Sequence, residues 1–175
     1  MQRRAALAWL PAAALPLAGC GAAEVQTFPT LAAAMKAVEG LGSLAGARHT
    51  GAWTLAQMLE HAAQSIEYSL RGFPQPKGAL FQATIGKAAF AVFEARGRMS
   101  HSLDEPIPGA PPIDAKAPLV PAIARALQAL REFDAHTGTL APHFAYGALD
   151  KAQYTRAHLM HLANHWDEVK TGNAA

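Results

Sequence analysis

The chain has 175 residues, of which 51% are hydrophobic and 16% are charged. This composition allows one globular domain with a sizeable apolar core, and it excludes a disordered or collagen-like chain. The formal net charge is +2, but Arg3 and Arg4 precede every other charged residue, so the remainder has 15 − 2 = 13 basic and 13 acidic side chains. Because this remainder is neutral, we expect no nucleic-acid partner.

Residues 1–19 are typical of an export signal: an arginine pair, an apolar stretch over 5–17 and small residues before Cys20. The apolar stretch is too short to span a membrane and contains two prolines. Leu-Ala-Gly before Cys20 resembles the lipobox of bacterial lipoproteins, which implies that this single cysteine is acylated and anchors an exported protein to the envelope. The arginine pair also resembles a twin-arginine signal. Two other interpretations of Cys20 are a small residue near an ordinary signal-peptidase site and a free thiol in a cytosolic protein.

Helical spacing of apolar residues predicts one domain over residues 29–170, after a linker at 20–28 and before a tail at 171–175. Helices are expected at residues 30–41, 53–70, 80–95, 119–135 and 150–170. In the third of these, the predicted inward positions are Phe81, Ile85, Ala88, Ala89, Val92 and Phe93. Asp150 and Gln153 have the form of a capping box, which places the start of the last helix. No segment alternates as a strand would.

Residues 99–118 contain five prolines and cannot form a helix. A connection of this length in a compact domain is expected to be an ordered functional loop. The predicted fold is therefore all-α, most simply an up-and-down four-helix bundle made by the second to fifth helices, with the short first helix packed alongside.

The histidines are the residues whose placement suggests metal binding. On the last helix, seven residues fall on one face: Tyr154, Ala157, His158, His161, Leu162, His165 and Val169. His161 and His165 are one turn apart and can converge on one cation, while His61 on the second helix is the candidate third ligand. The competing interpretation is that such a pair is a coincidence of spacing. The loop histidines are His49, His101, His136 and His143, expected to be solvated, although His101 and His143 could reach a pocket mouth.

Several segments, including parts of 80–111, resemble a known family. Residues 53–62, which read WTLAQMLEHA, are similar to the first metal-ligand helix of the DinB/YfiT-like superfamily of bacterial four-helix bundles. Residues 143–149 together with HLANH at 161–165 resemble the final loop and helix of a branch of unknown function. The resemblance covers most of residues 31–169 and implies a divalent metal held by His61, His161 and His165. Asn164 departs from the branch, which usually has a histidine there.

The resemblance implies a metal site without fixing a reaction. Three imidazoles and an open position suit zinc, nickel, cobalt or iron(II), and such a site lowers the pKa of water or a thiol. One hypothesis is a metal-dependent hydrolase or thiol-dependent transferase acting on a small molecule, with His158, Asn164 and His143 as candidate orienting groups. The alternative is a non-catalytic envelope lipoprotein that binds a small ligand or a partner and has a structural metal. Membrane attachment would come only from a lipid on Cys20, and a homodimer remains open.

Overall fold

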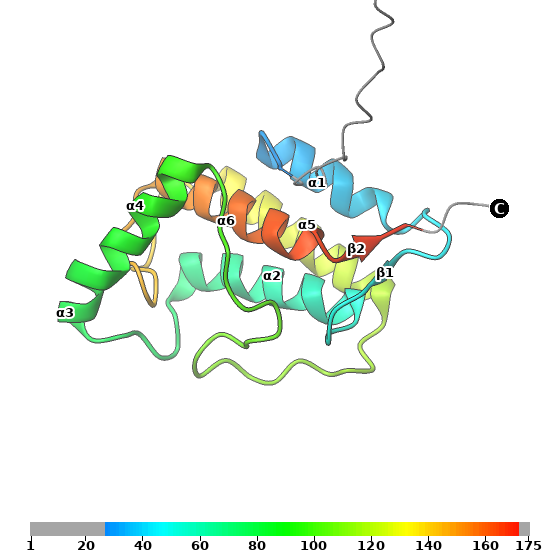
Figure 1. Ribbon diagram of the computed structural model, residues 1–175. Coiled ribbons are helices and arrows are strands. Elements are labelled where there is room, and N and C mark those ends of the chain that lie inside the picture. Colours follow the sequence, from blue (N-terminus) through cyan, green and yellow to red (C-terminus); the bar gives the residue numbers. More distant parts are fainter. Residues whose placement is uncertain (1–26, 172–175) are drawn as a thin grey trace, which may run out of the picture.

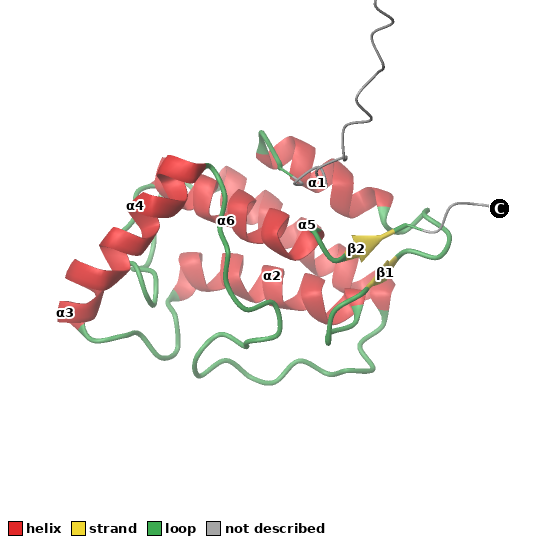
Figure 2. Ribbon diagram, in the orientation of Figure 1, coloured by secondary structure: helices red, strands yellow, loops and turns green. Residues whose placement is uncertain are grey.

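The computed structural model describes residues 27–171 and shows a mainly helical protein, as the sequence predicts (Figures 1 and 2). Its elements are α1 (Leu31–Gly40), β1 (Arg48–His49), α2 (Leu55–Arg71), α3 (Ala79–Phe81), the π-helical turn η1 (Gln82–Gly86), α4 (Lys87–Arg96), α5 (Leu119–Ala135), α6 (Lys151–Trp166) and β2 (Val169–Lys170). The proposed signal and Cys20 lie outside the described residues. Within residues 27–171, no helix is long and apolar enough to cross a membrane.

Side-chain caps fix where the helices begin. Thr54 and Gln57 form a reciprocal capping box before α2, with the Gln57 amide donating to Thr54 Oγ1 at 3.1 Å and the Thr54 amide donating to Gln57 Oε1 at 2.9 Å. Asp150 and Gln153 do the same for α6, which confirms the predicted start of that helix. These caps satisfy backbone donors that would otherwise have no partner, and they set the register of the two helices that carry the metal-site candidates.

The main core joins α1, α2, α5 and α6, which lie side by side in Figure 1. Val38 of α1 is fully buried in this core, as are Met58 and Leu59 of α2 and Phe133 of α5. The first helix thus packs against the others and shares their core, whereas the expected third helix contributes to a separate cluster. A short helix that buries one complete apolar stripe contributes to a core as fully as a long one.

The helical segment α3–η1–α4 lies at one end of the molecule (Figure 1) and contacts the rest through a separate small cluster of Phe90, Met99, Ala157 and Met160. Its predicted inward stripe is wrong, because Ile85 is 62% exposed and Val92 is 44% exposed. Gly86 is buried instead, and a Cβ there would lie only 1.9 Å from the carbonyl oxygen of Ala145. The helical segment therefore packs on the loop before α6 through Gly86, where the absence of a side chain lets the two backbones approach closely.

The last helix is shorter than predicted. It ends at Trp166, and Val169–Lys170 pairs antiparallel with Arg48–His49, so that His49 lies opposite Val169 (Figure 2). The backbone of Glu168 accepts hydrogen bonds from both the amide and the hydroxyl of Thr50. These long-range bonds replace the next helical turn, and two-residue strands are too short to produce an alternating pattern in the sequence.

The connection between α4 and α5 is non-helical, as predicted, and it runs across α6 and α2 in the view of Figure 1. It is anchored by buried Met99 and Ile107, and the carbonyl of Pro111 accepts from Gln64 of α2 at 3.3 Å. The loop therefore covers one side of α2, close to His61.

Candidate metal centre

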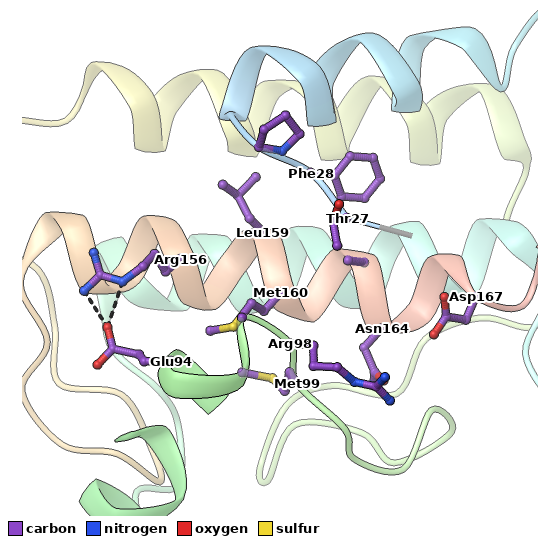
Figure 3. A pocket seen from close by; sticks show the side chains of 13 residues that line it. Thr27, Phe28, Glu94, Arg98, Met99, Arg156, Leu159, Met160, Asn164 and Asp167 are labelled. Atoms are coloured by element: carbon purple, nitrogen blue, oxygen red, sulfur yellow. Dashed lines mark hydrogen bonds and ion pairs between the residues drawn. The ribbon is translucent and has the colours of Figure 1, made fainter. Parts of the chain in front are cut away.

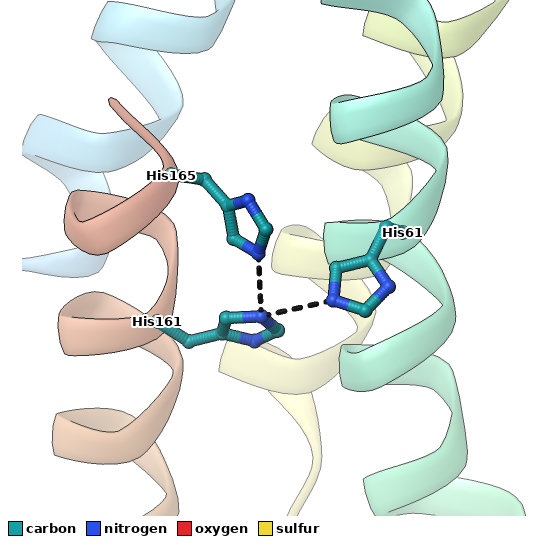
Figure 4. A group of neighbouring side chains, drawn as sticks. All are labelled: His61, His161 and His165. Carbon is teal, nitrogen blue, oxygen red and sulfur yellow. Dashed lines mark hydrogen bonds between the residues drawn. The ribbon is translucent and has the colours of Figure 1, made fainter. Parts of the chain in front are cut away.

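The three histidines selected from the sequence lie together between two helices. His61 comes from α2, and His161 and His165 come from successive turns of α6 (Figure 4). The Nε2 atom of His161 lies 3.1 Å from that of His61 and 3.1 Å from that of His165. One nitrogen from each ring lies within 4.8 Å of the other two. The two capped helices thus bring three nitrogens that could bind a metal ion close together.

The arrangement of these nitrogens fits a cation. A neutral imidazole nitrogen carries either a proton or a lone pair, so His161 Nε2 cannot donate to one neighbour and accept from the other. In a tetrahedral site with metal–nitrogen bonds of about 2.0–2.1 Å, ligand nitrogens lie about 3.3–3.4 Å apart, and adjacent octahedral positions lie about 3.0 Å apart. The separations of 3.1 Å fall between these values. Three imidazoles are also a ligand set that divalent transition metals accept.

Burial keeps these rings uncharged. It lowers the pKa of His61 to about 4, assisted by the charge of His101, and lowers that of His165 to about 2, assisted by His61, His101 and His49. The pKa of His161 is also far below its usual value, chiefly through burial. Because a neutral imidazole has a free lone pair, the three rings can bind a cation at neutral pH.

Within residues 27–171, the rings of His61 and His165 are oriented by aromatic packing rather than by a carboxylate. Trp53 stacks on His165, with ring centroids 6.1 Å apart, and lies 4.9 Å from His61. The Nδ1 atoms of His61 and His165 are buried and have no hydrogen-bond partner within the described part of the chain. The sequence did not single out Trp53, although it stands just before the capping box that starts α2.

Two histidines expected in solvated loops lie close to the site. The ring of His101 is 4.9 Å from that of His161 and 5.4 Å from that of His165. The side chain of His49 is 0% exposed, its Nδ1 donates to the carbonyl of Trp53, and its Nε2 lies 3.3 Å from Glu168. The expectation of a solvated His49 is therefore wrong, because the β1–β2 pairing folds it inward.

A cavity of about 190 Å³ adjoins the cluster and has His61 and His161 in its wall. Its apolar wall comes from the proline-rich loop and the loop before α6, through Met99, Pro106, Ile107, Pro108, Phe144 and Tyr146. Its polar wall includes Ser65, Lys77, His101, Glu105, His143 and His158. The long loop is thus part of the site, and a small molecule in this cavity would contact two of the three clustered histidines.

The three candidate orienting groups have different positions. His143 and His158 line this cavity. Asn164 instead lines a second cavity, of about 220 Å³, between α6 and the residues that precede α1 (Figure 3). Its amide donates to the carbonyl of His101 at 3.4 Å. Asn164 therefore contacts the site through the loop that carries His101.

Comparison with known proteins identifies a family. A family model described as a protein of unknown function (DUF1569) matches residues 23–171. No curated protein matches the chain, and no solved structure matches it either. The matched range includes both helices that carry the three histidines and the loops that line the cavity, but its description names no activity.

Proposed function

Since the chain belongs to the DUF1569 family, whose function is unknown, we propose a function from its own geometry: it binds one divalent metal ion through His61, His161 and His165 and acts as a metal-dependent enzyme on a small molecule. The observation that carries this proposal is the convergence of three Nε2 atoms, two of which belong to histidines in the wall of a cavity, His61 and His161. The likeness of residues 53–62 and 143–165 to the DinB/YfiT-like superfamily supports the same ligand set.

The residues of the chain prepare the site for this role. When bound, a divalent ion supplies Lewis acidity and lowers the pKa of water or a thiol at an open position. Burial keeps the three rings neutral, and the buried Ile107 anchors the proline-rich loop in the wall of the cavity. The cavity admits a small molecule beside His61 and His161.

Hydrolysis and thiol transfer are the two reaction classes considered, and we favour hydrolysis. Low-molecular-weight thiols are kept mainly in the cytosol, whereas residues 1–19 are typical of an export signal. Among the residues that line the cavity, Glu105 is the only carboxylate, and it is exposed. The chain's own contribution is therefore expected to come from imidazoles rather than from a buried carboxylate base.

Metal analysis of the purified mature protein tests the site directly. We expect about one equivalent of divalent metal per chain, as for a single three-ligand site, and its loss in both His161→Ala and His165→Ala. His136→Ala is the matched control, because His136 lies in the loop after α5 and outside the cavity wall. Full metal content in both α6 variants would contradict the assignment.

A second measurement separates an enzyme from a protein with a structural metal. With cobalt(II) in the site, added azide should change the visible spectrum if a coordination position is open. An unchanged spectrum at saturating azide would favour a closed structural site and the non-catalytic alternative. This comparison needs no knowledge of the substrate.

Export and lipidation form a separate proposal, which depends only on the sequence. We propose that Cys20 is acylated and anchors the protein to a bacterial envelope. Cells that express the full chain should incorporate radiolabelled palmitate into it, and Cys20→Ser should abolish the label. An unlabelled wild-type protein would contradict lipidation without affecting the metal site.

A further inference from the structure

The cavity beside His61 and His161 is also lined by His143, whose Nε2 forms no hydrogen bond within residues 27–171. The Nε2 atom of His158 is already engaged, because Ser69 donates its hydroxyl proton to the carbonyl of Ile66 at 2.6 Å and its oxygen accepts from His158 at 3.1 Å. Asn164 faces another cavity. This leaves His143 as the candidate orienting group with a free nitrogen.

The protonation state of His143 follows from its neighbours. Its Nδ1 accepts hydrogen bonds from two backbone amides, those of Ala145 at 3.1 Å and Tyr146 at 3.2 Å. An imidazole nitrogen can accept only through its lone pair, so Nδ1 carries no proton, and the proton of the neutral ring is on Nε2. Burial, assisted by the charge of His158, lowers the pKa of His143 to about 3, so the ring is neutral at physiological pH.

The ring is held rigidly. The ring stacks on that of Tyr146, with centroids 4.2 Å apart and planes 6° apart. The ring centroid of Phe73 lies 4.9 Å from that of His143. The backbone of His143 exchanges two hydrogen bonds with that of Gly147, whose φ of +76° closes the turn. Gln82 of η1 donates to the carbonyl of His143, so the π-helical turn fixes the loop from outside.

This fixed ring presents a donor to the cavity. His143 is only 8% exposed and lines the cavity that contains His61 and His161. Within residues 27–171, the hydrogen bonds of its ring involve Nδ1, and none uses the Nε2 proton. Since this nitrogen has no protein partner and is not fully enclosed, a ligand or a water molecule can reach it and accept its proton.

The rest of the cavity indicates what kind of ligand would supply that acceptor. Met99, Pro106, Ile107 and Tyr146 form an apolar wall, while Lys77 and Glu105, both exposed, contribute one charge of each sign to the lining. A molecule with an apolar body and one acceptor oxygen would match this wall and the N–H of His143, and a carboxylate oxygen is the acceptor that forms the strongest hydrogen bond with such a donor.

We propose that His143 donates its Nε2 proton to a carboxylate oxygen of a small organic acid bound in the cavity beside His61 and His161. His143 is thus a residue that positions and selects the substrate. The identification of the cavity as a substrate site rests on the proposed function, whereas the proton on Nε2 does not.

The test compares wild-type protein with His143→Asn. The Asn Oδ1 atom can still accept from the amides of Ala145 and Tyr146 and preserve the turn, but the shorter side chain offers no donor at the Nε2 position. Benzoate is the probe, benzyl alcohol is its uncharged counterpart, and His136→Asn is the matched control outside the cavity. Binding is measured by calorimetry on cobalt-loaded and metal-free protein.

We expect wild-type protein to prefer benzoate over benzyl alcohol, and His143→Asn to bind benzoate about tenfold more weakly or worse, as for loss of a charge-assisted hydrogen bond. Metal content should be unchanged in both Asn variants. Nitrogen-15 NMR of metal-free wild-type protein should show the proton of His143 on Nε2, with a shift of that nitrogen when benzoate is added.

Three results would overturn the inference: a proton on Nδ1, no binding of benzoate to wild-type protein, or equal affinity in wild type and His143→Asn. Failure of the proposed function has a different signature, because absent metal in wild-type protein leaves the NMR result and the metal-free titration intact. The two proposals can therefore fail separately.

Discussion

Burial keeps the histidines of the cavity neutral, so that each ring has a lone pair, and at the same time it makes the stability of the fold sensitive to acid. His158 shows this most simply, since it is buried between Tyr154 and Phe133 and its Nε2 donates to Ser69. Burial, followed by the nearby charge of Lys151, lowers its pKa to about 3. The unfolded chain binds a proton at this ring below about pH 6.5, whereas the folded chain does not until far lower pH.

The sign of the pH dependence follows. Between about pH 6.5 and pH 3 the unfolded state holds more protons, so stability decreases as the pH falls. One such group contributes a slope of about 1.4 kcal/mol per pH unit over that range. We expect His158→Gln to be less stable than wild type at pH 7, but to lose less stability between pH 6 and pH 4. Urea unfolding of metal-free protein at several pH values measures both effects.

The groups that face His158 define the control for this experiment. Lys151 lies on the same helix, and the rings of His143 and His161 carry their own lowered pKa values. His136→Gln changes none of these contacts and should keep the wild-type slope. An identical slope in His158→Gln and wild type would show that His158 does not titrate as its burial requires.

Much of the site is predictable from single residues, and the reason lies in helical geometry. The spacing of His161 and His165 places both on one face, and His61 borders the apolar stripe of α2, so their convergence needs only two adjacent helices. His49 and His101 were not predictable as neighbours of the cluster, because each lies on irregular chain whose path depends on long-range contacts. Trp53 was missed because no motif marks an aromatic residue that covers a metal site.

At the scale of elements, the segment from Ala79 to Arg96 shows why an apolar pattern can mislead. It has apolar residues on more than one face, so its sequence allows two registers. In the structure the face with Gly86 and Phe90 is buried. The loop before α6 packs directly against the backbone of Gly86, where any side chain would clash with it. The other face, with Leu80, Ile85 and Val92, is exposed.

A pair of substitutions distinguishes the two registers. Ile85→Gln should change the free energy of unfolding by no more than about 0.5 kcal/mol, because the side chain is exposed. Phe90→Ala should cost about 3–5 kcal/mol, because it removes a ring packed on Met99, Ala157 and Met160. Urea denaturation of the two variants against wild type measures both values. The reverse order of effects would support the stripe predicted from sequence.

At the scale of the whole molecule, the core and the metal-site cluster are adjacent but distinct. The core residues of α1, α2, α5 and α6 are apolar, and Arg125 of α5 also pairs with Glu60 and Glu67 of α2. The number and positions of these helices were predictable from periodicity and capping. Which of them share the core was not, because several apolar stripes of similar width compete for the same partners, and only their combined packing decides.

This separation predicts how the protein behaves without metal. Since the core does not depend on the three histidines, chelation by EDTA should leave the far-ultraviolet circular dichroism spectrum helical, unlike that of a small domain that folds only around its metal. Metal at about 1,000 times its dissociation constant stabilises the folded state by about 4 kcal/mol, which corresponds to roughly 10 °C in the melting temperature of a chain of this size. We therefore expect a lower Tm after chelation, restored by added metal in wild type and not in His161→Ala. Loss of the helical spectrum on chelation would show instead that the metal holds α2 and α6 together, and the site would then be structural.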